Sequence, residues 1–358
     1  MREGGTVMLT VSSKVLSLSS EAAVLIRAGR IVYANMRAEK LLGSGCVGKP
    51  LTALLSAEIC QSQAGIFTAD TVLAGKRYNV RTARLDDLQA LFFSEISIAP
   101  ALVNDAFLFS MRSALMNLRL SANLSQSRAE QGGNSELGSY LRSIQRDVFR
   151  ITRLLDNASV VRSIAREELA VSMASLDLAA LCHAVIDSVS LLRPDISFRF
   201  YGEESFYLIA DRVLIEQLLY NLISNALVHA EGLEHITLSL NPTPTQDIVS
   251  VSDDGCGIDE EVMGHVFERY RAFFALGEMG RGAGLGLSVV RAIAQAHDGT
   301  LMLESRPGSG TSARVSLSRK LPGKALSAPK GDGLGENALL IGLADCLDAD
   351  CYDGKYLD

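Results

Sequence analysis

The pattern of apolar and polar positions changes three times along the 358-residue chain. Residues 12–100 contain short apolar runs separated by turn residues, which predicts short strands. Residues 105–170 repeat apolar positions about every 3.5 residues, which predicts long helices. Residues 172–320 mix both patterns, and residues 321–358 begin as a linker rich in Pro, Gly, Ser and Lys. The pattern predicts an α/β protein with several domains.

The first segment is expected to form a small α/β module. Strands are predicted at residues 23–26 and 31–33, around a turn at Gly29, and a helix from Met36 to Leu42 should end at Gly43. Residues 76–84 and 90–98 have further strand character. The passage VLIRAGRIVYANMRAEKLLG, followed by VGKPLTALL, resembles the opening of a PAS sensor domain. This resemblance names no ligand, and a module used only for dimerisation or packing fits it equally well.

The second segment is predicted to be a helical hairpin. Its apolar positions are spaced by three and four residues: Leu108, Met111, Leu115 and Leu118, then Leu137, Leu141, Ile144, Val148, Ile151 and Leu155. The polar stretch from Ser125 to Ser135, which includes Gly132, is expected to separate the two helices. Two helices bury little surface alone, so pairing with a second copy into a four-helix bundle is expected. A homodimer is the simplest form, and a heterodimer stays open.

Charge and composition narrow the possible functions. The net charge is −7, and no cluster of Lys and Arg predicts a nucleic-acid-binding surface. No apolar run approaches the roughly 20 residues of a membrane-spanning helix, and the N-terminus lacks a signal-peptide pattern. A cytoplasmic protein is therefore expected. The first 182 residues contain no histidine, which excludes a His-ligated haem there.

The third segment carries four motifs in a fixed order. ADRVLIEQLLYNLISNALVHA has helical spacing and places Asn221 and Asn225 on one face. IVSVSDDGCGID runs from a strand into Asp253, Gly255 and Gly257, where a carboxylate could accept a hydrogen bond from the amine of adenine. GEMGRGAGLGLSVVRAIAQAHDG is a glycine-rich loop that opens a helix, an arrangement able to bind phosphate. SRPGSGTSARVSL is a turn between two strands.

Together the four motifs resemble the N, G1, G2 and terminal glycine boxes of histidine-kinase ATP-binding domains. This resemblance covers residues 172–320 and implies an α/β sandwich shared with gyrases, heat-shock chaperones and mismatch-repair ATPases. It also implies ATP and Mg²⁺ as cofactors, with Asn225 as the Mg²⁺ ligand. The nucleotide-site residues implied by the resemblance are Asn221, Asn225, Asp253, Gly255, Gly257, Phe267, Arg269, Arg281, Gly282, Gly284, Leu285, Gly286 and Thr311.

Two positions depart from relatives of this domain. Members of the family often carry Lys three residues after the Mg²⁺ asparagine, where this chain has Val228. One phosphate contact is therefore expected to be missing. The hydrolytic relatives place a glutamate four residues before that asparagine, where this chain has Asn221, which cannot act as a general base. A gyrase-like or chaperone-like ATPase is accordingly disfavoured.

The hairpin lacks the histidine that carries the phosphoryl group in histidine kinases. The best match to the family's H-E-L-R-T-P-L motif is Phe109-Ser110-Met111-Arg112-Ser113-Ala114-Leu115. Phe109 then stands at the acceptor position, and phenylalanine has no nucleophilic atom. The whole hairpin contains no histidine, so this absence does not depend on the alignment. His183, the nearest histidine that follows, is expected to be a packed helix residue.

Three functions remain compatible with the sequence. The first is an ATP-binding signalling protein of a two-component pathway that acts as a regulatory partner, with a response regulator as a candidate partner. The second is a protein kinase that acts in trans on a partner's His, Ser or Thr. The third is a nucleotide-sensing scaffold without phosphoryl transfer.

The tail at residues 321–358 is interpreted as a linker followed by an acidic end. Residues 337–345 could dock as a short helix. Cys346 and Cys351 lie among aspartates, and a solvated acidic tail is favoured over a metal site because a second pair of ligands is missing.

Overall fold

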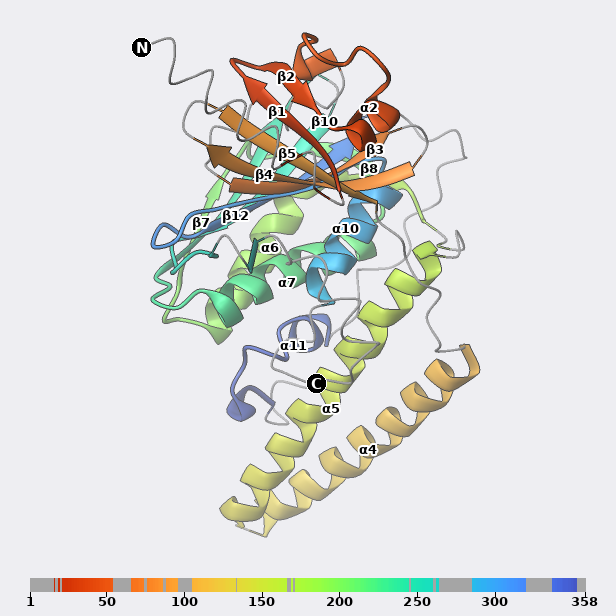
Figure 1. Ribbon diagram of the computed structural model, residues 1–358. Helices are drawn as coiled ribbons and strands as arrows, with labels where there is room; N and C mark the ends of the chain where they lie inside the picture. The colour runs from red at the N-terminus through yellow and green to blue at the C-terminus, as the bar shows by residue number, and fades with distance from the viewer. Residues whose placement is uncertain are drawn as a thin grey trace. The chain divides into compact units, whose positions relative to one another are not determined.

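The computed structural model describes residues 16, 19, 21–53, 66–73, 76–85, 88–95, 105–132, 134–165, 169, 171–244, 246–259, 262–263, 285–319 and 337–352 (Figure 1). The chain forms two compact units. Unit 1 consists of Met1–Ile98, Gly257–Val266 and Thr300–Ser312. Unit 2 consists of Ala99–Cys256, Phe267–Gly299 and Ala313–Asp358.

Unit 1 is built on an antiparallel sheet. Its strands are β1 (Ala22–Arg27), β2 (Arg30–Ala34), β3 (Ile66–Leu73), β4 (Lys76–Leu85), β5 (Leu88–Glu95) and β11 (Leu301–Ser305), in the order β2-β1-β5-β4-β3-β11. Helix α2 (Met36–Leu42) packs against β1, and a 3-10 turn, η1 (Leu51–Ala53), follows. The sequence predicted the first two strands and α2, but it did not predict β3.

Asn35 ties the first elements of unit 1 together. As the N-cap of α2, its Oδ1 accepts a hydrogen bond from Ala38 N at 2.9 Å, and it also accepts one from Ala23 N in β1 at 3.0 Å. Its Nδ2 donates to Glu21 O at 2.8 Å. The asparagine of the PAS-like passage therefore has a structural role, because one buried amide fixes the corner between β1, β2 and α2.

Strand β11 belongs to unit 1 because it pairs with β3 over Met302–Ser305 and Ile66–Ala69. Met302 also joins the buried apolar cluster formed by β1, β4, β5 and α2. Part of the segment predicted as one ATP-binding domain, strand β11, thus pairs with the N-terminal sheet.

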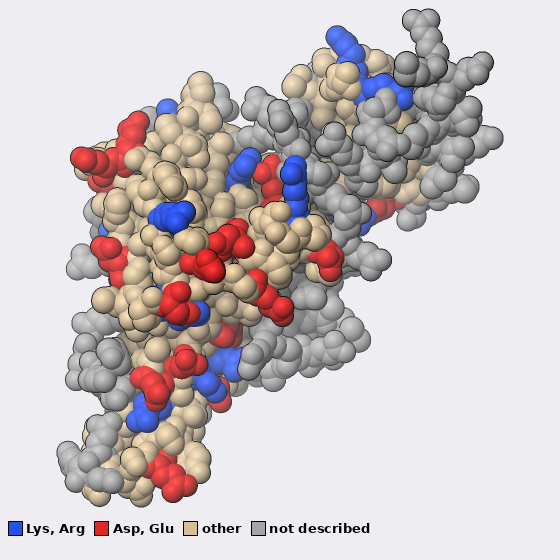
Figure 2. All heavy atoms as spheres, turned by 90° about the vertical axis from the view of Figure 1, so that its left-hand side faces the viewer, with Lys and Arg blue, Asp and Glu red and all other residues tan. Residues whose placement is uncertain are grey.

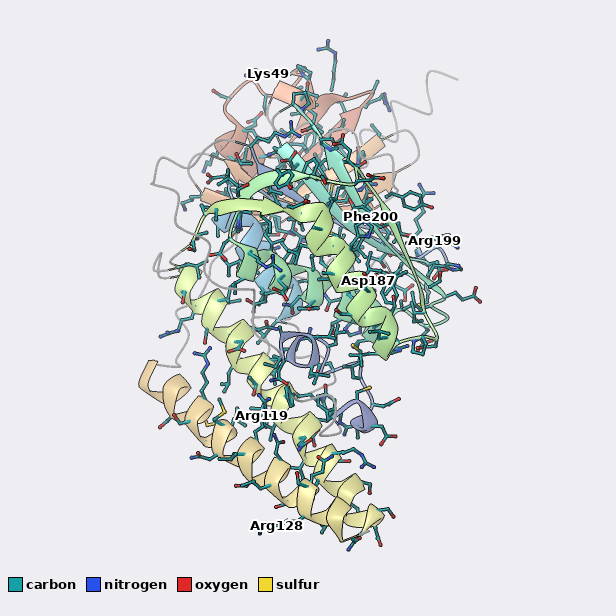
Figure 3. The ribbon with its side chains drawn as sticks, turned by 180° about the vertical axis from the view of Figure 1, so that it is seen from behind. Lys49, Arg119, Arg128, Asp187, Arg199 and Phe200 are labelled. Atoms are coloured by element: carbon teal, nitrogen blue, oxygen red, sulfur yellow. The ribbon has the colours of Figure 1, made fainter. Side chains whose placement is uncertain are left out.

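The helical hairpin of unit 2 consists of α4 (Asp105–Gln131) and α5 (Ser135–Ala165). The polar stretch expected to separate them is shorter than predicted, because residues 125–131 continue α4 and only the residues around Gly132 lie between the helices. Ala129 is buried, and Gln, Arg, Ala and Glu are good helix formers, so this polar sequence stays helical. Figure 3 shows Arg119 between the two helices, where its guanidinium lies 4.7 Å from the centre of the Phe149 ring.

The apolar repeat of α5 is divided between two faces. Leu141 and Val148 are buried, whereas Leu137, Ile144 and Ile151 are 40–49% exposed. Alternate members of the predicted seam are therefore buried, and the others stay exposed in the part of the chain that the structure describes.

The rest of unit 2 is an α/β arrangement. Strands β7 (Ser197–Tyr201), β9 (His235–Pro242), β10 (Gln246–Asp253) and β12 (Thr311–Ser318) form a sheet in the order β12-β10-β9-β7, and β6 (Ala174–Asp177) pairs with β8 (Tyr207–Ala210). Helices α6 (Leu178–Leu192), α7 (Arg212–His229) and α10 (Gly286–Ala296) pack together beside this sheet (Figure 1). Their apolar faces are buried, which agrees with the predicted α/β sandwich.

The tail is folded where the structure describes it. Residues 337–345 include a short helix, α11 (Ala338–Gly342), as the sequence suggested, and a 3-10 turn, η2 (Ala349–Tyr352), follows. The interpretation as a solvated acidic tail was wrong for this stretch, because Tyr352 is fully buried and the Asp345 side chain is only 13% exposed. Apolar residues between the aspartates bury the segment against α5 and α7.

Charged side chains of both signs are interspersed over the described surface drawn in Figure 2. Among the described helices, none combines the length and the apolar character needed to cross a membrane.

Candidate functional site

Helix α7 holds the first predicted motif. Asp211 caps it, since Asp211 Oδ1 accepts hydrogen bonds from Val213 N at 3.1 Å and Leu214 N at 3.3 Å. Asn221 and Asn225 lie one turn apart, and Gly286 lies against both of them. A Cβ atom at Gly286 would come within 3.0 Å of Asn225 Oδ1 and 3.3 Å of Asn221 Oδ1. The structure therefore brings the first and third motifs together.

Asn225 carries an unpaired polar atom. Its Nδ2 is buried and, within the part of the chain that the structure describes, has no hydrogen-bond partner. An unsatisfied buried amide costs about 1–3 kcal/mol. A polar ligand that reaches this amide would remove that cost, so the residues present fit an oxygen-rich group such as a phosphate.

Helix α10 begins at Gly286, directly after Leu285. Leu285 is buried and gives α10 no side-chain cap. The first backbone N–H groups of a helix lack partners inside the helix and favour negative charge. Because the start of α10 lies beside Asn225, an amide and a helix N-terminus meet at one place in unit 2.

The second motif forms a tight turn at the end of β10. Gly255 N donates to Asp253 Oδ1 at 3.1 Å. Gly255 lies against Ala230, so that a Cβ atom there would come within 2.4 Å of Ala230 Cβ. The turn therefore requires glycine at 255, and it holds the Asp253 carboxylate at the end of the strand.

The remaining described members of the predicted site lie in unit 1. Gly257 has a φ of 72°, and a Cβ atom there would lie 2.1 Å from Arg306 O. Ser305 Oγ lies 3.0 Å from Thr311 Oγ1 and accepts a hydrogen bond from Ile258 N at 2.8 Å. Gly257 and Thr311 thus belong to one bonded cluster. Phe267, Arg269, Arg281, Gly282 and Gly284 lie outside the described residues.

Two site residues from α5 were not predicted from the sequence. Arg153 Nη2 and Asn157 Nδ2 each donate to Asn221 Oδ1 at 3.2 Å. The sequence contained a usable signal, because Phe149, Arg153 and Asn157 recur every four residues along α5, apart from the apolar seam. A second face on a bundle helix indicates a second packing partner.

Asp254, beside Asp253, was also missed. It accepts hydrogen bonds from Glu234 N and His235 N at 3.0 and 2.9 Å, and its Oδ2 lies 2.8 Å from His235 Nδ1. Burial alone would raise the pKa of Asp254, but the bonds from the His235 and Glu234 backbone outweigh it and lower the pKa to about 2. Asp254 therefore stays ionised and fixes the start of β9.

The stretch that aligns with the acceptor motif of histidine kinases lies on α4. Phe109 and Ser110 are part of that helix, and Arg112 Nη2 donates to Asp156 Oδ1 at 2.8 Å and Ser159 Oγ at 3.0 Å on α5. The arginine of the aligned motif therefore links the two helices. Burial raises the pKa of Asp156, and the bond from Arg112 opposes this shift.

Two histidines of unit 2 have structural surroundings. His183 is exposed on α6, and its ring packs 4.5 Å from that of Phe200 on β7, which Figure 3 labels. His297 is buried at the end of α10, with Nε2 accepting from Asp211 N at 3.0 Å and Nδ1 lying 2.8 Å from Ile293 O. The packed-helix interpretation therefore describes His297 better than His183.

Comparisons with known proteins agree with this architecture. Residues 210–321 match the family described as histidine kinase-, DNA gyrase B-, and HSP90-like ATPase. The chain is 27% identical over 281 residues to the sensor histidine kinase TmoS of Ectopseudomonas mendocina, a match that covers 76% of this chain and 27% of TmoS. It is 34% identical over 168 residues to the sensor histidine kinase YkoH of Bacillus subtilis, covering 46% of this chain and 36% of YkoH. The chain thus spans about a third or less of the length of these relatives.

A solved structure of the histidine kinase ThkA in complex with the response regulator protein TrrA is also similar. It has a TM-score of 0.38 and 20% identity, with 86% of this chain and 98% of that chain covered.

Residues 210–321 therefore form an ATPase domain of the kind shared by histidine kinases, gyrase B and HSP90. Within that group, the sensor histidine kinases to which the chain is similar support a histidine-kinase type for this domain.

Proposed function

We propose that this chain is an ATP-binding signalling protein of a two-component pathway that does not autophosphorylate on its own hairpin. The observation that carries the proposal is a contrast within the chain. Asn221, Asn225 and Gly286 meet at one place, as nucleotide binding requires, while the hairpin has no histidine and Phe109 stands at the acceptor position.

In this proposal each site residue has a distinct task. Asn225 holds Mg²⁺, which neutralises phosphate charge when bound, and Asn221 supports the phosphates. Asp253 accepts a hydrogen bond from the adenine amine, and Gly255 and Gly257 line the base. Gly282, Gly284 and Gly286 wrap the phosphates, Arg269 and Arg281 contact them, and Phe267 anchors the loop between them.

The wider organisation is part of the same proposal. Residues 12–100 form a PAS-like sensor domain, 105–170 a dimerisation hairpin, 172–320 the ATP-binding domain and 321–358 the tail. The uncovered apolar positions of α5 support a homodimer through a four-helix bundle. Pairing with a response regulator, as in the ThkA complex, is the expected partnership.

Nucleotide binding is tested by calorimetry with a non-hydrolysable ATP analogue and Mg²⁺. The chain should bind the adenine analogue and prefer it to the guanine analogue, because guanine has a carbonyl oxygen at the position where adenine offers its amine to the Asp253 carboxylate. D253N should weaken binding about tenfold or more, as expected for losing a hydrogen bond to a charged group. D259N is the control, since it makes the same charge change at an exposed residue nearby. Equal affinities for D253N and the unchanged chain would contradict the assignment.

Phosphoryl transfer is tested by incubation with radiolabelled ATP and Mg²⁺. The chain alone should carry no acid-labile label, because Phe109 cannot form a phosphoramidate. An acid-labile label on the purified chain would refute this part of the proposal. A label found only on an added kinase or receiver protein would instead identify the chain as an enzyme that acts in trans.

A further inference from the structure

Residues 337–352 are bound to the helices that carry the candidate site. Leu340, Leu343 and Leu347 are buried, and the segment lies against α5 and α7 (Figure 1). Gly342 touches α7 so closely that a Cβ atom there would lie 2.7 Å from Tyr220 Cβ. The contact is therefore a packed interface rather than a loose association.

An aromatic residue closes this interface at its far end. The Tyr352 ring packs 5.1 Å from the Phe149 ring of α5, and its hydroxyl donates to Leu340 O at 3.1 Å. Arg119 of α4 lies over the same Phe149 ring. The segment is thus attached to the hairpin at one end and to α7 at the other.

The charged centre of the interface is Asp345. Its Oδ2 accepts from Arg153 Nη1 at 2.7 Å, and its Oδ1 accepts from Arg150 Nε at 3.1 Å. The Arg153 side chain is only 7% exposed, and the same Nη1 donates to Ser224 Oγ at 2.8 Å. A buried guanidinium needs a counter-charge, since removing one partner of a buried ion pair is strongly destabilising. Asp345 provides that charge.

Arg153 and Asn157, one turn apart on α5, both form hydrogen bonds with the side-chain amide of Asn221. Asn221 Oδ1 accepts from both of them, which uses both of its lone pairs. Asn221 Nδ2 donates to Gln217 O at 2.9 Å and to Asn157 Oδ1 at 3.4 Å. An amide with all four positions engaged has none left for a nucleotide, in contrast to Asn225 one turn later.

We infer that residues 337–352 are an internal clasp that holds α5 on Asn221 and so opposes nucleotide binding. Asp345 neutralises Arg153, Arg153 stays on Asn221, and the amide becomes available only when the clasp releases α5. The apparent affinity for nucleotide is then reduced by the fraction of molecules in the clasped state. This inference rests on the proposed function, since it assigns a regulator to the same nucleotide site.

The test is the affinity of purified full-length variants for the Mg²⁺-loaded ATP analogue. D345N removes the counter-charge of Arg153 with little change in shape, so it should tighten binding about fivefold or more, the usual scale of coupling between sites. D350N is the matched control. Asp350 lies on the same segment and pairs with Arg142 at 3.1 Å, but its side chain is 88% exposed. The affinity of D350N for the ATP analogue should therefore equal that of the unchanged chain.

A second variant, R153M, tests whether Asp345 acts on Asn221 through Arg153. R153M keeps the aliphatic stem but removes the charge and the donors to Asn221, so it should tighten binding as well. In the R153M background, D345N should add nothing, because the clasp no longer acts through Arg153. Hydrogen exchange in α5 should rise in D345N without nucleotide, which reports release of the helix directly.

The outcomes separate the inference from the function on which it rests. Nucleotide binding by the unchanged chain, with D345N equal or weaker, would overturn the clasp alone. Equal gains in D345N and D350N would overturn it too, because the effect would then be one of charge. Failure of every chain to bind the analogue would overturn the proposed function and the inference together.

Discussion

At the scale of single residues, two glycines allow the cost of backbone strain to be compared with the cost of steric overlap. Gly257 and Gly308 have nearly the same φ, 72° and 74°. Gly308 has open space where a Cβ atom would lie, whereas Gly257 faces Arg306 O at 2.1 Å.

Replacing each of these glycines with alanine should therefore have different costs. G308A should lower the free energy of unfolding by about 1–2 kcal/mol, the cost of a left-handed residue with a side chain. G257A should cost about 3 kcal/mol or more, because the backbone at Arg306 must also move. Urea unfolding of both variants measures the difference. Similar values for the two would show that the turn at Gly257 adapts freely.

Residue-level prediction succeeded where a local pattern has one physical explanation. The DxGxG pattern predicted tight turns at Gly255 and Gly257, and the structure shows the close contacts that require glycine at both positions. Arg153 and Asp345 could not be linked in this way. They are 192 positions apart, and their pairing depends on how α5 and the tail meet.

At the scale of elements, His297 connects the end of α10 to the start of α7. Its Nε2 accepts from Asp211 N, so the folded state requires the neutral ring. Burial lowers the pKa of His297, and the bond with Ile293 O only partly opposes this shift.

The stability of the chain should consequently depend on pH through this residue. Below about pH 6.5, the ordinary His pKa, the unfolded chain binds a proton at His297 that the folded chain does not, so stability falls as pH falls. The slope should approach 1.4 kcal/mol per pH unit at most for one proton. H297Q keeps an acceptor without titrating and should flatten the slope between pH 6.5 and 5. Urea unfolding at several pH values measures it, with H183Q, at an exposed site, as the control.

Periodicity predicted the long elements better than their ends. The apolar repeat predicted both hairpin helices, because a helix seam explains its spacing. Residues 125–131 have the polar composition of a loop, and the burial of Ala129 in the structure explains why they are helical. Strand β3 was missed; β4 follows it directly, but its second pairing partner, β11, lies far along the chain. Such pairing is a long-range property that no local window contains.

At the scale of the whole molecule, the proposed dimer depends on the uncovered half of the α5 seam. Ile144 and Ile151 are 49% and 40% exposed and lie two helical turns apart. Replacing both with Glu should place charge in the centre of the bundle and give a monomer by light scattering. L191E is the control, because Leu191 is 83% exposed on α6 and belongs to no seam. A dimer that survives the double substitution would show that the chain associates through another surface.

The burial of Tyr352 determines which truncated forms of this chain keep its native packing. The family match ends at residue 321, so a fragment that stops there would keep the whole matched domain. Such a fragment would lose the contact between the rings of Tyr352 and Phe149, and it would leave Arg150 and Arg153 without the Asp345 carboxylate. The solubility and ligand affinity of such a fragment would differ from those of the intact chain. Measurements meant to describe the intact chain should therefore include every residue through Tyr352.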